Sequence, residues 1–233
     1  MSKRTTTRKR VKAVRRQDPL EDIAFGKTVD NPADWDLDFK IKENYQLTPT
    51  QVELTYIAVL AALKLLQRRQ VDNIIYIRSI VESASRSMGA LPGELEEKFA
   101  PWSMPLIDKL EEVLSGGVGA NLMSKGYIKC IPVNFTRGLT FKNSCVIIDE
   151  AQNMTTSELT TILTRFGVDS KYVVVGDTYQ ADIGVKSGFK RICKAFNTPS
   201  SDEWGIETFN FTSDDIVRSE VLRFIVDRLG TIK

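Results

Sequence analysis

The residues best suited to chemistry are two adjacent carboxylates, Asp149 and Glu150, which follow the apolar run at residues 145–148. Four consecutive apolar residues are typical of a strand that is buried on both faces. In open parallel sheets, ligands bind just beyond the carboxyl ends of the strands. One carboxylate there can hold Mg²⁺ through its water shell, and the next can orient or deprotonate a water. The simpler alternative is a strand followed by a polar turn.

A second acid-bearing loop follows the next apolar run, residues 171–175, and contains Gly176, Asp177 and Gln180. If the two runs are neighbours in a parallel sheet, both loops meet at one edge. Gln180 would then be placed to sense a phosphate or to position a water. A purely loop-stabilising amide is the alternative for Gln180.

Strands alternate with helices along the rest of the chain, which predicts a parallel sheet with helical crossovers. A helix start is expected at Thr48, with Pro49 at its first position and Gln51 completing a capping box. A second capping box joins Thr155 to Glu158. The expected strands are residues 74–77, 127–133, 145–148, 171–175 and 206–211. The expected helices are residues 48–70, 105–114, 155–165, 187–196 and a last helix that begins after Ser213.

Composition excludes several kinds of site. The chain has 233 residues and no histidine, so a Ser-His-Asp triad, a Cys-His pair and a His-ligated zinc site are impossible. The three cysteines, Cys130, Cys145 and Cys193, lack metal-ligand spacing and are interpreted as reduced core residues of a cytoplasmic protein. The longest apolar run, residues 56–63, is too short to span a bilayer, so we expect no membrane association.

Charge separates the N-terminal region from the remainder of the chain. Residues 1–16 contain eight Lys or Arg and no acid; the other 24 basic residues face 30 acidic ones, a net charge of −6. Residues 1–45 therefore predict a poorly ordered arm, basic and then acidic, ahead of one domain at residues 46–233. The arm could attract nucleic acid by counterion release, or it could be a solvated extension.

Several motifs together resemble the PhoH-like family of predicted ATPases, which are relatives of superfamily 1 helicases. The motifs with the strongest resemblance are residues 149–153, 163–165 and 176–182. Further matches are Arg78, residues 81–82, 91–98, 137–140, 187–188 and 215–218. The resemblance extends from about Thr55 to Arg228. It implies a RecA-like P-loop NTPase domain with a mostly parallel sheet flanked by helices.

The resemblance also implies roles for the nucleotide-binding residues. Asp149 is similar to the Walker B aspartate that binds Mg²⁺ through water, and Thr55 to the last residue of the phosphate-binding loop, a further Mg²⁺ ligand. Glu150 resembles the general base for the attacking water. Asp177 is a candidate nucleotide contact, and Gln180 resembles the helicase glutamine that couples phosphate state to movement. The implied cofactors are ATP and Mg²⁺.

Three arginines also have counterparts in the family. Arg218 resembles a C-terminal arginine that stabilises transferring phosphate, and in a homo-oligomeric ring it would do so across a subunit boundary. A surface ion pair is its alternative. Arg78 and Arg137 are candidates for RNA or phosphate contacts, with salt bridging as the default. The family has a second arginine where this chain has Leu139, which weakens the assignment of that loop.

One essential part of the family pattern is missing. A P-loop needs backbone N–H groups that cradle phosphates and a Lys that reaches the β/γ oxygens. This chain has Leu54 at the Lys position and Glu53 at the preceding Gly, so the first strand and the Walker A loop are absent. The Gly-Lys-Thr at residues 26–28 lacks the first glycine of the motif and is followed by Pro32. We interpret it as a chance match.

Two explanations of this gap remain open: an internal deletion between Gln51 and Thr55, or a degenerate family member that has lost strong nucleotide binding. The intact carboxylates and Gln180 favour the first. In either case we expect a gap in the sheet and weak or absent hydrolysis of ATP by the chain as written. The alternative function is a nucleic-acid-binding or scaffolding pseudo-ATPase that uses the basic arm.

Overall fold

The computed structural model describes residues 39–41, 54–79, 95–178, 180–211, 224 and 228, with the side chains of residues 95–102 left out. The chain divides into two units, residues 1–35 and 36–233, of which only the second contains described residues. The expected capping box at Thr48, the basic arm, the Gly-Lys-Thr at residues 26–28 and Arg218 all lie outside the described part.

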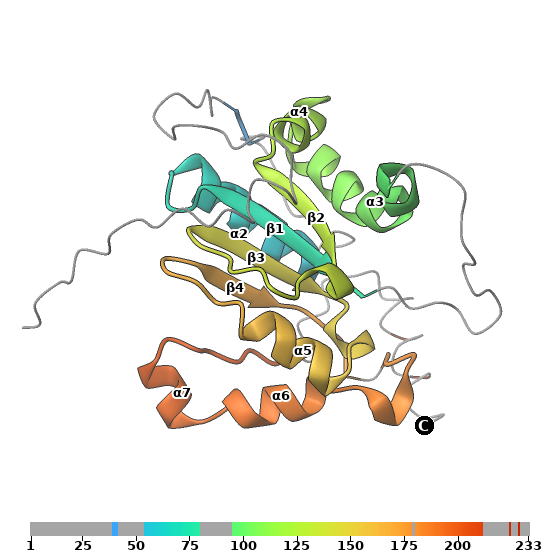
Figure 1. The fold of residues 1–233 in the computed structure, drawn as a ribbon, viewed down its shortest axis with the longest axis vertical. Helices are drawn as coiled ribbons and strands as arrows, with labels where there is room; N and C mark the ends of the chain where they lie inside the picture. The colour runs from blue at the N-terminus through green and yellow to red at the C-terminus, as the bar shows by residue number, and fades with distance from the viewer. Residues whose placement is uncertain are drawn as a thin grey trace, which may run out of the picture. The chain divides into compact units, whose positions relative to one another are not determined.

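Four strands form a parallel sheet in the order β2-β1-β3-β4 (Figure 1). They are β1 Asn73–Arg78, β2 Ile128–Pro132, β3 Ser144–Asp149 and β4 Lys171–Val174. Strand β3 is buried at all six positions, as its four consecutive apolar residues predicted. The register pairs Arg78 with Asp149 and Ile148 with Val174, so the ends of β1, β3 and β4 meet at one edge. The parallel α/β architecture predicted from the sequence is confirmed.

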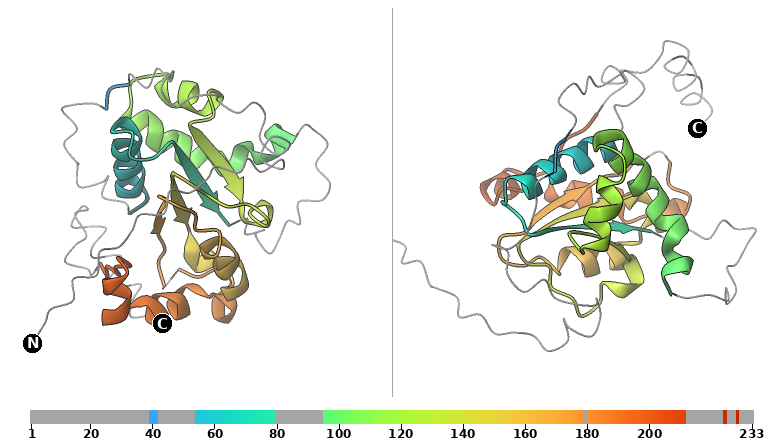
Figure 2. Two further views of the ribbon diagram at one scale, coloured as in Figure 1. Left: turned by 60° about the vertical axis from the view of Figure 1, so that its left-hand side comes forward. Right: turned by 90° about the horizontal axis from the view of Figure 1, so that it is seen from above.

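Helices cover the sheet and its edges. They are α2 Leu54–Gln67, α3 Leu95–Val113, α4 Val118–Ser124, α5 Thr156–Leu163, α6 Phe189–Phe196 and α7 Pro199–Glu203. Short 3₁₀ turns lie at η2 Val133–Phe135, η3 Ala151–Asn153 and η4 Gly184–Lys186. Helices α2 and α5 cover opposite faces, as Figure 2 shows when the sheet is seen on edge.

Side chains alternate between the two faces of each strand. Ile75 and Ile77 of β1 join one apolar cluster with Leu159 and Ile162 of α5 and Phe189 of α6. The other side chains of β1 point to the opposite face, where α2 packs against β1 and β3. Tyr76 belongs to that second face and is 1 % exposed.

The predicted capping box at the start of α5 is confirmed: Thr155 accepts from the backbone N–H of Glu158, and the Glu158 carboxylate accepts from the N–H of Thr155. The predicted start of an earlier helix, α3, was wrong. We expected a helix at residues 105–114, but α3 begins ten residues earlier, at Leu95. Pro105, the first residue of the expected helix, lies inside α3, although proline favours the first turn of a helix. Helix α4 was not predicted.

The strand expected at residues 206–211 was also wrong. These residues lie within the described part of the chain but outside the sheet, and Phe209 and Phe211 are 74 % and 55 % exposed. Their sequence has strand-like residues, yet these residues form no described ladder with the outer edge of β4. In the described sheet, β4 is the last strand on that side.

Candidate active site

Asp149 is the centre of a polar network at the carboxyl end of β3. Its side chain is almost fully buried, and its Oδ1 accepts a hydrogen bond of 2.7 Å from Oγ1 of Thr55, the second residue of α2. Its Oδ2 accepts a second bond from the hydroxyl of Tyr76. The two residues to which the family pattern gives Mg²⁺ are therefore in contact, although 94 positions separate them in the sequence.

Tyr76 is a site residue that the sequence analysis missed. Its run of apolar neighbours in β1 reads as plain core, but a buried phenol needs a hydrogen-bond partner. Burial, and after it the negative charge of Asp149, raise the pKa of the Tyr76 hydroxyl well above its ordinary value. The hydroxyl therefore stays protonated and donates to Asp149 across the neutral pH range.

Glu150 turns the chain out of the sheet. Its backbone has φ 53° and ψ 39°, a left-handed conformation that is uncommon for a residue with a side chain and is often found at functional sites. Its carboxylate accepts a 2.6 Å hydrogen bond from Nε2 of Gln152. Partial burial and the neighbouring charge of Asp149 raise the pKa of Glu150, while Arg78 and Gln152 act in the opposite direction.

Arg78 lies beside both carboxylates. Its guanidinium is 3.9 Å from Oδ2 of Asp149 and 3.5 Å from Oε1 of Glu150. The strand register explains this position, because Arg78 is the partner of Asp149 across β1 and β3. Salt bridging was the default expectation for Arg78, and in the structure its guanidinium forms salt bridges with Asp149 and Glu150.

Gln152 and Asn153 connect the carboxylates to the second acid-bearing loop. Oε1 of Gln152 accepts a 3.0 Å bond from the backbone N–H of Asp177. The Asn153 side chain donates through Nδ2 to Oδ2 of Asp182 and accepts through Oδ1 from the backbone N–H of Asp182. Gly176 is required here because a Cβ would lie 2.8 Å from Oε1 of Gln152. In the sequence, Gln152 and Asn153 were identified only as part of a family motif. Their hydrogen bonds show that they hold the loop after β3 to the loop after β4.

The other predicted site residues lie further from the network. Gln180 is exposed, and its side chain makes no hydrogen bond within the described part of the chain. Arg137 is exposed in the turn between η2 and β3, next to Gly138, whose φ is 81°. The structure thus brings together Thr55, Arg78, Asp149, Glu150 and the backbone of Asp177, and leaves Gln180 and Arg137 outside the network.

The oxygen donors at Asp149 fit a hard divalent cation. Mg²⁺ in proteins is commonly held by one or two carboxylates and completes its shell with water and phosphate oxygens. Among the described residues there is no group of three or more acidic or cysteine side chains that could enclose a metal without such partners. The phosphate side does not fit: Leu54, at the start of α2, carries no charge where a P-loop has its Lys.

Comparison with known proteins shows the family to which the chain is similar. The family model described as PhoH-like protein matches residues 46–229 of this chain. The chain is 36 % identical over 188 residues to a PhoH-like protein of Bacillus subtilis, covering 78 % of this chain and 56 % of that protein. A PhoH-like protein of Mycobacterium tuberculosis is 36 % identical over 185 residues, covering 78 % and 51 %. Protein PhoH of Escherichia coli is 36 % identical over 173 residues, covering 71 % and 46 %.

The parallel sheet, its flanking helices and the carboxylates at its edge define an α/β domain of the RecA-like P-loop NTPase class. Within that class, the chain belongs to the PhoH-like family. It spans about half the length of the curated relatives it matches. No helix in the described segments is long and apolar enough to cross a membrane.

Proposed function

We propose that this chain is a cytoplasmic PhoH-like ATPase domain whose cation-binding and water-activating side is intact and whose phosphate-binding side is deficient. The observation that carries the proposal is the 2.7 Å hydrogen bond between Thr55 and Asp149. A hydroxyl and a carboxylate in contact at the end of a central parallel strand are the protein ligands that a Mg²⁺–nucleotide site requires.

Each residue predicted for the nucleotide site has a proposed task. Thr55 and Asp149 hold Mg²⁺, which when bound neutralises charge on phosphate oxygens. Glu150 accepts the proton of a water, and a carboxylate whose pKa is raised towards neutrality is a better base than an ordinary one. Asp177 contacts the nucleotide, and Gln180 senses its phosphates. Arg218 stabilises the transferring phosphate, in trans if the chain forms a homo-oligomeric ring.

The same reasoning limits the activity. Without backbone amides and a Lys to hold the triphosphate, electrostatic stabilisation of the transferring group is lost. We therefore expect ATP binding to be weak and hydrolysis to be slow or absent in the chain as written. Coupling to RNA unwinding or processing belongs to the family expectation, with Arg137 and Arg78 as candidate contacts.

The decisive experiment measures divalent-cation binding and ATP turnover on one set of variants. Thr55→Val keeps the shape of the side chain and removes its hydroxyl, and Thr55→Ser is the matched control that retains it. Mn²⁺ binding, followed by electron paramagnetic resonance, is expected to weaken about tenfold in Thr55→Val, the loss of one good ligand, and to change little in Thr55→Ser. Unchanged binding in Thr55→Val would contradict the cation site.

Turnover of ATP tests the second half of the proposal. Release of phosphate by the wild-type chain is expected to stay near background and to be the same in Glu150→Gln. A rate typical of P-loop enzymes, abolished by Glu150→Gln, would show that the phosphate-binding deficiency is wrong.

The alternative function is a nucleic-acid-binding pseudo-ATPase, and the observation that favours it is the concentration of eight basic residues within positions 1–16. In that case RNA affinity should fall steeply with salt and disappear when residues 1–16 are removed, while ATP has no effect.

A further inference from the structure

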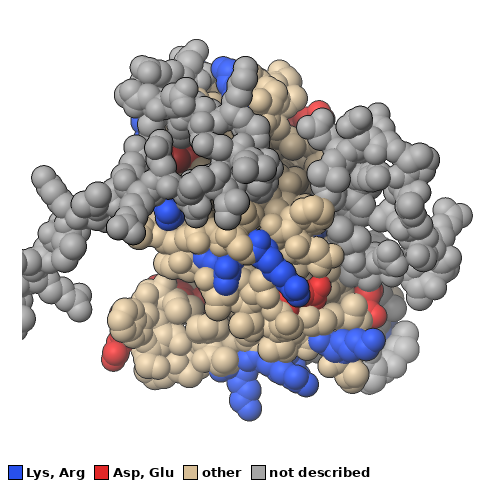
Figure 3. Space-filling view, in the orientation of Figure 1, with Lys and Arg blue, Asp and Glu red and all other residues tan. Residues whose placement is uncertain are grey.

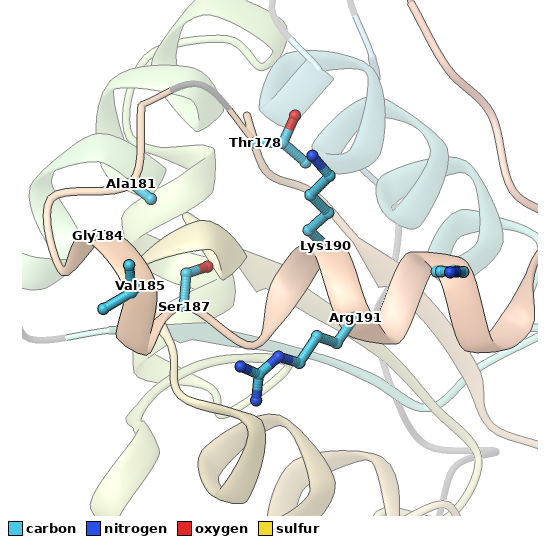
Figure 4. Close-up of a pocket in the computed structure, with 8 residues that line it drawn as sticks. Thr178, Ala181, Gly184, Val185, Ser187, Lys190 and Arg191 are labelled. Carbon is cyan, nitrogen blue, oxygen red and sulfur yellow. The ribbon is translucent and has the colours of Figure 1, made fainter.

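A basic hollow lies beside the second acid-bearing loop, between that loop and α6 (Figure 4). Its volume is about 370 Å³. Thr178, Ser187 and the side chains of Lys190, Arg191 and Lys194 contribute to its lining. None of these residues belongs to the network around Asp149.

The residues that line the hollow include three cations and no acid, and Asp177 and Asp182 flank its loop wall. No Asp or Glu occurs between Asp182 and Asp202, whereas Lys186, Lys190, Arg191 and Lys194 all fall in that interval. All four are exposed, and within the described residues none forms a salt bridge. In Figure 3, Lys and Arg side chains project from the part of the surface where Figure 1 places α6.

The geometry suits a chain of phosphates rather than one enclosed anion. Figure 4 shows Lys190 extending from α6 towards Thr178, and Arg191 extending from the other side of the same helical turn. Lysine acts as a flexible point charge and arginine as a planar fork, and both are common ligands of phosphate. Hydroxyl groups on Thr178 and Ser187 add hydrogen-bond donors of the kind that contact phosphate oxygens.

Side-chain and backbone bonds attach the walls of the hollow to the rest of the domain. Asn153 bonds to Asp182, and the backbone N–H of Gly188 donates to the carbonyl of Met154 at 2.9 Å. A Cβ on Gly188 would lie 2.3 Å from the backbone nitrogen of Thr156, so the start of α6 is packed tightly against the start of α5. The cations are therefore presented by a fixed backbone.

We propose that this hollow binds the phosphodiester backbone of single-stranded nucleic acid, independently of ATP and through residues other than those of the basic arm. The proposal goes beyond the proposed function, because it requires neither the cation site nor hydrolysis. It also assigns to α6 a contact that the family pattern places on Arg78 and Arg137.

The test compares two triple variants of the full chain with the same change of net charge. Lys190→Gln/Arg191→Gln/Lys194→Gln removes the cations of the hollow. Lys64→Gln/Arg68→Gln/Lys125→Gln removes three exposed cations that do not line it. Because both proteins keep residues 1–16, any attraction by the basic arm is equal in the two.

Binding of fluorescently labelled U20 and dT20 is measured by anisotropy between 50 and 300 mM salt. Each phosphate contact contributes about 0.7 to the slope of log affinity against log salt for single strands. Loss of two to three contacts should lower that slope by roughly 1.5 to 2 and weaken binding by about tenfold to 100-fold at 0.1 M salt. The control triple should retain most of the wild-type affinity and slope.

Equal losses in the two triples would overturn the proposal, because the effect would then be one of overall charge. Two competitors test the chemical class. Polyglutamate of matched charge displacing U20 as well as unlabelled U20 does would contradict a nucleic-acid site, and so would tripolyphosphate binding with no oligonucleotide binding. Similar loss of U20 and dT20 is expected, since the backbone phosphate is common to RNA and DNA.

Discussion

The two halves of the sheet differ in how completely they are covered and paired. Strand β3 is buried at every position, while no residue of β4 is fully buried. Near β3, the buried hydroxyl of Tyr76 donates to Asp149. On β4, the hydroxyl of Tyr172 is enclosed but has no hydrogen-bond partner within the described part of the chain.

This difference follows the chemistry of the family site. The covered half carries the carboxylates and their partners, which need rigid and partly dehydrated surroundings to hold their geometry. On the other side the described sheet ends at β4, and Phe209 and Phe211 of the expected fifth strand are exposed and do not pair with it. An additional strand along β4 would cover that edge, which is where the described sheet ends.

The largest effect is expected from removing the charge at the centre of the covered half. In Asp149→Asn, Arg78 loses a neighbouring charge and the hydrogen bonds from Thr55 and Tyr76 lose their charged acceptor. Disrupting one member of a buried ionic network typically costs about 3 kcal/mol. Denaturant unfolding should show this loss, whereas Asp169→Asn, at an exposed position just before β4, should change the free energy of unfolding by less than about 0.5 kcal/mol. Equal losses would show that the halves do not differ.

A smaller and more specific contrast is expected from the two tyrosines. Tyr76→Phe removes a hydrogen bond to a carboxylate and should reduce the free energy of unfolding by about 2 kcal/mol. Tyr172→Phe removes a hydroxyl that has no partner, so it should be neutral or stabilise the domain by up to about 1 kcal/mol. The two substitutions delete the same atom, and thermal unfolding compares them directly. A loss of 2 kcal/mol in Tyr172→Phe would mean that its hydroxyl is paired in solution.

Sequence patterns predicted the covered half of the fold well because its signals are local. The apolar run before Asp149, the capping box at Thr155 and the strand before Arg78 each depend on residues within one element. The strand at residues 206–211 was mispredicted because pairing depends on a distant partner, which no local pattern records. The early start of α3 was missed because the sequence around Pro105 does not distinguish a proline in the first turn of a helix from one inside a longer helix.

The sequence was sufficient to predict the carboxylates of the candidate site, but not the hydrogen bonds that support them. Asp149 and Glu150 were identifiable by their position after a buried strand, and Thr55 by resemblance to the family. Tyr76 was invisible because its contact with Asp149 arises from the pairing of β1 with β3. The clamp from Gln152 to Asp177 was equally invisible, since it joins loops 25 residues apart.

The smallest expected effect is in the reactivity of the cysteines. Burial raises the pKa of the Cys130 thiol to about 12 and that of Cys145 to about 11, and it also raises the pKa of Cys193. Cys145 is fully buried in β3, whereas Cys193 is half-buried on α6. Only the thiolate reacts with iodoacetamide, so a raised pKa lowers the rate at pH 7.5.

Peptide mapping by mass spectrometry after timed alkylation should therefore find Cys193 modified first, about tenfold faster than Cys145 and Cys130. Raising the pH should increase the rates at Cys130 and Cys145 by about tenfold per unit, with no plateau up to pH 10, because the thiolate fraction keeps rising until the pKa is reached. In denaturant the three rates should become equal. If Cys145 reacts as fast as Cys193 in the native protein, β3 opens as readily as the surface of α6, and the covered half has no special rigidity with which to hold Asp149.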